Sequence, residues 1–303
     1  MDDLLAHSLL VVTGKGGVGK STVAAALGLA ACRRGLRTIV VEVAARQDVA
    51  RVLAPGVADV YDKGSISHGP HYVSIEPQRA MEEYLRQRLP MGALVGRLSR
   101  SRIFSTLTAA TPGMRELLTI GKVWELARPE RRTRGAQPYD LVVLDAPATG
   151  HALAMLQAPS TFASVARVGP VAKQGRAIAS FLGDPRRTAI LAVSSAEEMA
   201  VSETLQLRSR LREELGVDLS LVVVNAVVRH RFSGGEERTL RAAPRSPAQH
   251  AAMFMATWAR HQRAQIARLR RSIPEVASVT LPFVFGSALD RASLEQLSTE
   301  LER

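Results

Sequence analysis

The chain has 303 residues, of which 46% are hydrophobic and 4% aromatic, and it carries a formal net charge of +12. This length and apolar content are sufficient for one large or two smaller globular domains. The basic charge would suit nucleic acid or an anionic membrane surface, but a solvated arginine-rich surface is the favoured interpretation. Cys32 is the single cysteine, which excludes an intramolecular disulfide and a thiolate metal cluster within one chain.

No apolar run approaches the length of about 18 residues that a membrane-spanning helix needs. The N-terminal residues Met1-Asp2-Asp3 also lack the basic start of a signal peptide. We therefore expect a soluble, cytoplasmic protein.

Apolar, β-branched runs alternate with helical patterns along the chain, which is typical of a parallel sheet wound with helices. The expected strands lie near residues 9–13, 38–43, 72–75, 141–144, 189–193, 219–225 and 276–281. The predicted fold is a doubly wound, mainly parallel α/β sheet of about seven or eight strands. We expect one domain over residues 1–303.

Some stretches lack a convincing strand and show apolar residues at helical spacing, which predicts helical insertions above the sheet. These insertions cover about 78–128 and 159–183. A break with prolines over 241–247 predicts a loop, and an amphipathic, arginine-rich helix is expected over 253–271. A last helix is expected over 287–303.

The stretch from Gly14 to Ser21 reads G-K-G-G-V-G-K-S and lies between an apolar strand and a predicted helix. Glycines let backbone N–H groups converge on a phosphate, Lys20 can reach the β- and γ-phosphates, and the Ser21 hydroxyl can hold Mg²⁺. The sequence therefore predicts a nucleotide site. Its expected binding residues are Gly14, Lys15, Gly16, Gly17, Val18, Gly19, Lys20, Ser21 and Thr22.

Asp145 follows the predicted strand 141–144, so its carboxylate should emerge at the carboxyl end of the strand, facing the phosphate loop. A carboxylate in that place is typical of an outer-shell Mg²⁺ ligand in phosphate-loop enzymes. Ser21 and Asp145 are therefore the predicted metal-binding residues.

Several segments resemble one family. Lys15, just after the first glycine of the loop, resembles the second lysine of the deviant Walker A group, which includes ParA, MinD, the nitrogenase iron protein and ArsA. Thr149-Gly150-His151, with their spacing from Asp145, are similar to switch II of the family of ArsA and the ATPase of guided entry of tail-anchored proteins. Further similar segments are Pro112–Glu116, Glu197–Leu205 and Val222–Asn225. The resemblance extends from Leu9 to about Leu297.

The resemblance implies an ATP- and Mg²⁺-dependent ATPase that acts as a homodimer or as a heterodimer with a related chain. In such a dimer Lys15 contacts the partner's nucleotide, and the implied catalytic residues are Lys15, Lys20 and Asp145. Asn225 would read the adenine, with backbone at Pro282 and Phe283 around the base. The alternatives are a solvated loop lysine at position 15 and a simple turn residue at position 225.

One departure concerns switch I, where the family carries an aspartate that orients the attacking water. Ala44 stands at that place, and the nearby polar residues Glu42, Gln47 and Asp48 are not in register with it. We therefore expect slow hydrolysis, or hydrolysis that needs a partner subunit.

The cargo is constrained by the cysteine content. Arsenite needs convergent thiolates, and a zinc clasp needs a cysteine pair, so Cys32 alone argues against both. A hydrophobic or membrane-protein client would need only an apolar groove. Methionine-rich helical insertions suit that role, although such residues also form internal cores. The candidate groove residues are Met91, Leu94, Leu98, Phe104, Leu107, Met114, Leu117, Leu118 and Met155.

Other classes of function remain. A regulatory subunit with little hydrolysis, paired with a related ATPase, is favoured by Ala44. A positioning ATPase of the ParA and MinD type is supported only by the basic charge. The Thr149–His151 switch argues against it, and nucleic acid is a disfavoured partner.

Overall fold

A single sheet organises the chain. The computed structural model describes residues 1–43, 48–53, 64–65, 69–88, 112–130, 136–166, 168–286 and 289–302. These residues form an eight-stranded sheet with the order β3-β4-β2-β5-β1-β6-β7-β8. All neighbours pair in parallel except the short β3, which is antiparallel to β4. The predicted α/β sheet is confirmed.

The strands closely follow the predicted apolar runs. They are β1 Leu9–Gly14, β2 Thr38–Val43, β3 Gly64–Ser65, β4 His71–Ile75, β5 Leu141–Ala148, β6 Thr188–Ser195, β7 Leu221–Val227 and β8 Ser278–Pro282. Only β3 is new, because a strand of 2 residues is too short to show an apolar pattern.

Among the described residues, helices precede, connect and follow the strands. They are α1 Asp2–Leu5, α2 Lys20–Arg33, α3 Asp48–Leu53, α4 Pro77–Arg88, α7 Met114–Leu126, α8 Thr149–Ala166, α9 Pro170–Gly183, α10 Glu198–Arg210, α11 Gly234–Ala242, α12 Pro247–Ser272 and α13 Arg291–Glu302. A π-helical turn over Leu211–Leu215 continues α10. The predicted break over 241–247 separates α11 from α12, which starts earlier than expected because Ser246 caps it.

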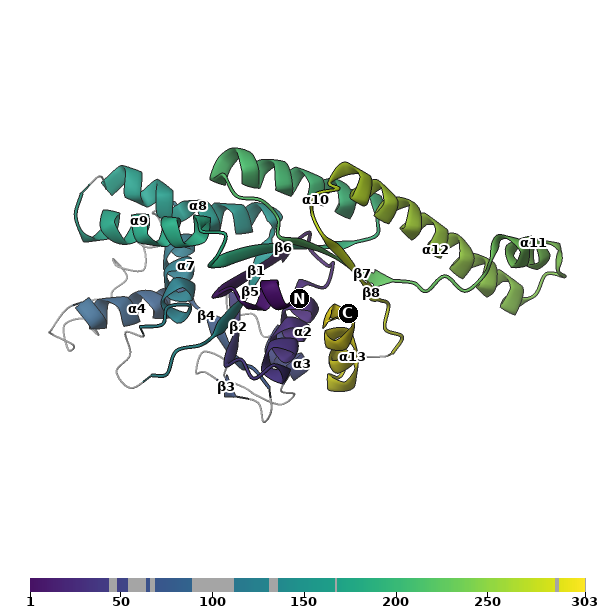
Figure 1. Ribbon diagram of the computed structural model, residues 1–303, viewed down its shortest axis with the longest axis horizontal. Coiled ribbons are helices and arrows are strands. Elements are labelled where there is room, and N and C mark those ends of the chain that lie inside the picture. The colour runs from purple at the N-terminus through teal and green to yellow at the C-terminus, as the bar shows by residue number, and fades with distance from the viewer. Residues whose placement is uncertain are drawn as a thin grey trace.

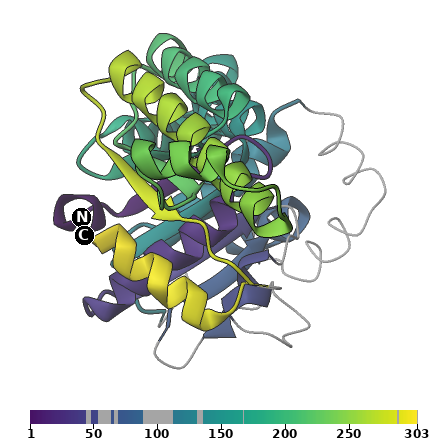
Figure 2. The same cartoon turned by 90° about the vertical axis from the view of Figure 1, so that its right-hand side faces the viewer.

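The sheet is buried on both faces, which explains its near-continuous apolar strands. In β1, Leu9 and Val11 join the core under α7, α8, α9, α10 and α12. Leu10 and Val12 join the opposite core under α2, α3 and α13. Figures 1 and 2 show the helices on the two sides of the sheet, with α13 beside α2.

Helices α4, α7, α8 and α9 gather at one end of the molecule, and α11 with the start of α12 lies at the other (Figure 1). Helices α4 and α7 lie in the first predicted insertion, 78–128, and the end of α8 with α9 lies in the second, 159–183. Pro159 lies inside α8 rather than at its start. Residues 89–111 of the first insertion lie outside the described part of the chain. Among the described helices, none combines the length and apolarity needed to cross a membrane.

Helices α8 and α9 pack closely where Gly175 faces Pro159. A Cβ atom added at Gly175 would lie 2.7 Å from the Pro159 carbonyl oxygen and 3.2 Å from the Ala163 Cβ. A backbone oxygen cannot move away without moving its helix. The small residue therefore sets the distance between the two helices.

We predict that Gly175→Ala lowers the free energy of unfolding by about 1–3 kcal/mol, because overpacking outweighs the gain in helix propensity. Gly183→Ala on the same helix is the matched control, since an added Cβ there meets nothing within 4 Å. The control should leave stability unchanged or raise it slightly. Urea unfolding measures both variants, and equal midpoints for Gly175→Ala and the wild type would contradict the close packing.

Candidate functional site

The loop between β1 and α2 depends on glycine geometry. Gly14, Gly17 and Gly19 have φ angles of 149°, 84° and 90°, a region that other residues rarely adopt. A Cβ at Gly14 would also collide with the Val193 carbonyl oxygen of β6. Strand, glycine-rich turn and helix start thus follow one another as the sequence predicted.

The loop fits a phosphate group. Lys20 is only 7% exposed, and its ammonium donates a hydrogen bond to the Lys15 carbonyl oxygen at 3.0 Å, so it lies across the loop. A Cβ at Gly16 or Gly17 would meet nothing within 4 Å, so the approach to their backbone is open. Backbone N–H groups at a helix start beside a cation form a favourable anion site.

The two predicted metal-binding residues lie together. Asp145 is fully buried on β5, at 0% exposure, and the Ser21 hydroxyl donates to its Oδ2 atom at 2.6 Å. A hydroxyl and a carboxylate beside a phosphate site are the oxygen ligands that Mg²⁺ prefers. The donor set therefore fits the metal, and metal binding itself stays a prediction.

A second buried carboxylate flanks Asp145. Glu42 of β2 is opposite Asp145 in the sheet register and is 1% exposed. It accepts hydrogen bonds from the Val49 and Ala50 N–H groups at the start of α3, at 3.0 and 3.4 Å. Burial raises the pKa of Glu42 to about 7, the α3 amides oppose that rise, and the Asp145 charge adds to it.

The predicted switch I lies mostly outside the described residues. Ala44 and Gln47 fall in the range 44–47, and Asp48 is the first residue of α3. The sequence indicated Glu42 only as a polar neighbour of this segment. Its link to α3 depends on burial, which the local pattern does not reveal.

Lys15 has a partner that the sequence did not predict. Its ammonium lies 2.9 Å from the Glu203 carboxylate on α10, and the two side chains are 29% and 33% exposed. An ion pair this exposed contributes only about 0–1 kcal/mol. Lys15 can therefore exchange Glu203 for a more highly charged anion.

The predicted base-binding residues lie at the ends of β7 and β8, next to the phosphate loop. The buried Asn225 side chain donates from Nδ2 to the Val18 carbonyl oxygen at 2.9 Å. The Phe283 N–H donates to the Val227 carbonyl oxygen at 2.9 Å, and Pro282 ends β8. The structure thus brings phosphate-side and base-side residues together, while their roles stay predictions.

Two of the family-like segments meet in one cleft at the carboxyl edge of the sheet. Arg115 and Glu116 of α7 line it on one side, and Pro147, Ala148 and His151 at the β5–α8 junction line it on the other. Helix α7 also packs against β5 and α8, so it lies beside the segment that follows Asp145.

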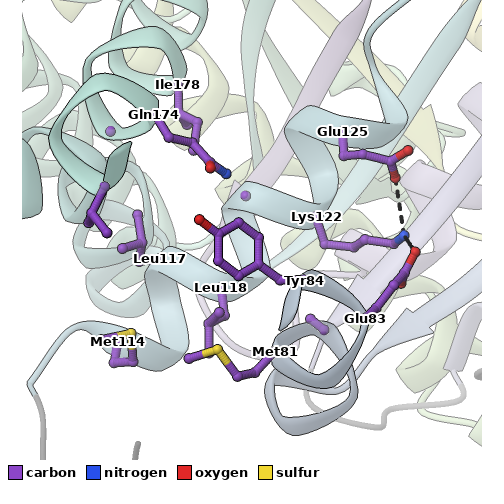
Figure 3. A pocket seen from close by; sticks show the side chains of 14 residues that line it. Met81, Glu83, Tyr84, Met114, Leu117, Leu118, Lys122, Glu125, Gln174 and Ile178 are labelled. Carbon is purple, nitrogen blue, oxygen red and sulfur yellow. Dashed lines mark hydrogen bonds and ion pairs between the residues drawn. The ribbon is translucent and has the colours of Figure 1, made fainter. Parts of the chain in front are cut away.

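A separate apolar pocket of about 170 Å³ lies between α4, α7 and α9 (Figure 3). Lys122 at its wall is paired with Glu83 and Glu125 at 2.6 and 3.1 Å. The apolar side chains that line it include Met81, Tyr84, Met114, Leu117, Leu118, Val171 and Ile178.

Of the predicted groove residues, Met114, Leu117 and Leu118 line this pocket. Met155 does not line it; this residue joins the core over the sheet and also lines the cleft at the β5–α8 junction. The remaining predicted groove residues, between 91 and 107, lie outside the described residues.

The Glu42 carboxyl predicts a pH effect on stability without nucleotide. Its pKa rises from 4.5 to about 7 on folding, so between these values the folded state retains a proton that the unfolded state releases. The free energy of unfolding should therefore fall as pH rises through this window, by up to about 3 kcal/mol.

Glu42→Gln removes this titration, so its stability relative to the wild type should rise by about 1–3 kcal/mol between about pH 5 and about pH 8. Glu130→Gln, at an exposed carboxylate, is the control and should show no such change. Urea unfolding at both pH values measures the difference. A constant difference for Glu42→Gln would show that its carboxyl titrates normally.

Comparison with known proteins gives a consistent result. Residues 7–171 and 163–302 match the anion-transporting ATPase family. ATPase BagA of Mycobacterium tuberculosis is 32% identical over 222 residues, 72% of this chain and 64% of that protein. The arsenical pump-driving ATPase of Acidiphilium multivorum is 26% identical over 295 residues, 90% of this chain and 46% of that protein. The chain spans less than two thirds of the length of these relatives. It belongs to the anion-transporting ATPase family, the family of ArsA.

Proposed function

We propose that the chain binds ATP with Mg²⁺, hydrolyses it slowly, and uses the bound nucleotide to control how protomers associate. The observation that carries this proposal is the glycine loop with its buried Lys20, set against the Ser21–Asp145 hydrogen bond. Family membership supports an ATPase in general.

The loop amides and the Lys20 ammonium hold the phosphates and offset their negative charge. Ser21 would hold the metal through its hydroxyl oxygen, and Asp145 would act as an outer-shell ligand. Mg²⁺, when bound, supplies charge neutralisation and a template for the phosphate oxygens. Because a hydroxyl coordinates through an oxygen lone pair, the Ser21 O–H can continue to donate to Asp145, which would link the metal site to β5.

Slow turnover is proposed because Ala44 carries no group that could orient a water molecule. Its methyl side chain cannot accept a hydrogen bond. The complete water-orienting site would then need a group from elsewhere, either another segment of this chain or a partner.

Lys15 is proposed to act across a dimer interface. Its exposed ion pair with Glu203 is weak, whereas a triphosphate carries several negative charges. Exchange of Glu203 for the partner's phosphate would therefore favour a closed dimer when nucleotide is bound. In this proposal Glu203 holds Lys15 in place until then.

Helix α7 offers a route from the nucleotide to the helical layer. Its N-terminal turn carries Arg115 and Glu116 in the cleft beside the β5–α8 junction. The same helix lines the apolar pocket with Leu117 and Leu118. A shift of that junction on nucleotide binding would therefore move one wall of the pocket.

We propose a hydrophobic helix, such as a segment of a membrane protein, as the client of this helical layer. The pocket is apolar, and methionines at its wall adapt to varied side chains. Val165, Val168 and Val171 at the α8–α9 junction are exposed, which extends the apolar surface. Arsenite is not proposed, because Cys32 is the one cysteine of the chain.

A second candidate is a regulatory subunit that binds nucleotide but leaves hydrolysis to a related chain. Ala44 is the observation that favours it. Native purification followed by identification of the co-eluting chain separates the two candidates. A related ATPase in the complex supports the regulatory subunit, and the same chain supports the homodimer.

We predict that calorimetry detects MgATP binding to the wild type and that its steady-state turnover stays below about 1 s⁻¹. Lys20→Ala should abolish most of the binding heat, because the phosphates lose their buried cation. Arg271→Ala, at the exposed end of α12, is the control for loss of a positive charge. A folded wild type that produces no heat with MgATP would overturn the proposed function.

We predict that Lys15→Ala raises the dissociation constant of the nucleotide-bound dimer by about tenfold or more, because it removes a phosphate contact across the interface. The nucleotide affinity of the monomer should stay within about twofold, since Lys15 does not contact its own nucleotide in this proposal. Sedimentation with a non-hydrolysable ATP analogue measures the first quantity and calorimetry the second.

Glu203→Gln is the companion variant, because it frees Lys15 without removing it. It should dimerise at the same or a lower protein concentration than the wild type. Dimerisation that is unaffected by Lys15→Ala would rule out the proposed role across the interface.

A further inference from the structure

The backbone just after Asn225 is strained. Ala226 has a φ of 57°, and among the described residues it is the one non-glycine with a positive φ. The register between β7 and β8 shifts between Val224 and Val227, so Ala226 lies in a bulge-like irregularity of β7. We call residues 225–228 the Ala226 turn. Such a conformation persists only where its surroundings enforce it, and it occurs frequently at functional sites.

Gln262 of α12 holds the Ala226 turn in this conformation. Its side chain is 4% exposed and lies against the turn. The Val228 N–H donates to its Oε1 atom at 2.7 Å, and its Nε2 atom donates to the Ala226 carbonyl oxygen at 3.1 Å. The Val228 donor therefore faces the amide oxygen of Gln262, and the Ala226 acceptor faces its amide nitrogen, so the orientation of the amide is fixed.

The clamped turn is continuous with the phosphate loop. Asn225, directly before Ala226, donates to the Val18 carbonyl oxygen at 2.9 Å. A Cβ at Gly19 would collide with the same Asn225 amide, so the loop and this side chain are in close contact. A chain of direct contacts therefore runs from α12, through the turn, to the nucleotide site.

A purely structural role for Gln262 would consist of satisfying buried backbone groups. That role would explain its bonds but would not require the clamped residues to follow directly after Asn225. The clamp fixes the backbone next to Asn225, and the direction of the Asn225 side chain depends on that backbone. Asn225 contributes an amide donor and an amide acceptor, which an adenine edge can match only when the amide is correctly placed.

We propose that Gln262 is a positioning residue for nucleotide base recognition, acting through the Ala226 turn on Asn225. This inference rests on the proposed ATP site. It makes the selection of adenine over other bases depend on α12, whose first turns lie beside α11 at the far end of the molecule (Figure 1). Phosphate binding by the loop itself does not depend on Gln262.

The test compares MgATP with inorganic triphosphate, which has the phosphates but no base. Gln262→Met keeps the side-chain length and removes both hydrogen bonds. It should weaken MgATP binding by about three- to tenfold, the range expected for a misplaced base contact, and change triphosphate binding less than about twofold. The preference for ATP over GTP should shrink in the same variant.

Two further variants make the test specific. Gln265→Met, one turn along the same helix, removes an amide that bonds Arg268 rather than β7, and it should change neither affinity. Gln262→Leu also removes both hydrogen bonds but has a different side-chain shape. It should resemble Gln262→Met in binding, and it keeps the test available if the methionine variant folds poorly.

A double-mutant cycle with Asn225→Ala tests the route of action. If Gln262 acts through Asn225, the double variant should bind MgATP no more weakly than Asn225→Ala alone. Additive losses, or equal losses for MgATP and triphosphate, would overturn the inference.

The wild type separates this inference from the proposed function. If it prefers ATP and Gln262→Met keeps that preference, only the inference fails. If it binds neither MgATP nor triphosphate, both fail.

Discussion

The hydrogen bond between the Ser21 hydroxyl and the Asp145 carboxylate holds the two halves of the site together. It joins the first turn of α2 to β5, across the phosphate loop that follows β1. The sheet order makes this contact possible, because β1 lies between β5 and β6 with all carboxyl ends at one edge. In open α/β sheets, ligands bind at such an edge where the strand order reverses.

Two buried carboxyl groups lie next to each other at this edge of the sheet. Glu42 and Asp145 are buried side by side, and burial, with the like charge of Asp145 as a smaller addition, raises the pKa of Glu42. A metal ion beside Asp145 would reduce that smaller contribution and so lower the pKa of Glu42. An ionised Glu42 binds the N–H groups at the start of α3 more strongly, since charge-assisted hydrogen bonds are the stronger ones. If Mg²⁺ binds as proposed, Glu42 would link its binding to the hydrogen bonds at the start of α3.

Much of the fold could be predicted because its signals are local. Parallel strands buried on both faces read as apolar runs, and the spacing of glycines and lysines in the phosphate loop is contained in eight residues. The contacts of Lys15 with Glu203 and of Gln262 with the Ala226 turn join residues far apart in the chain. Glutamate and glutamine are common on solvated helix faces, so these residue types alone did not predict either contact. Only the packing of α10 and α12 on the sheet assigns them partners.

Helix α7 contacts both the core over the sheet and the apolar pocket. Ile120 and Val123 fix it to the core over the sheet, while its first turn meets the cleft beside the β5–α8 junction. The apolar pocket takes its remaining walls from α4 and α9, which contribute no residue to the phosphate loop. If the pocket binds a client as proposed, substitutions on those two helices would change which client it accepts without altering the phosphate loop. The same sheet could then serve different clients, because function resides in the site and not in the fold.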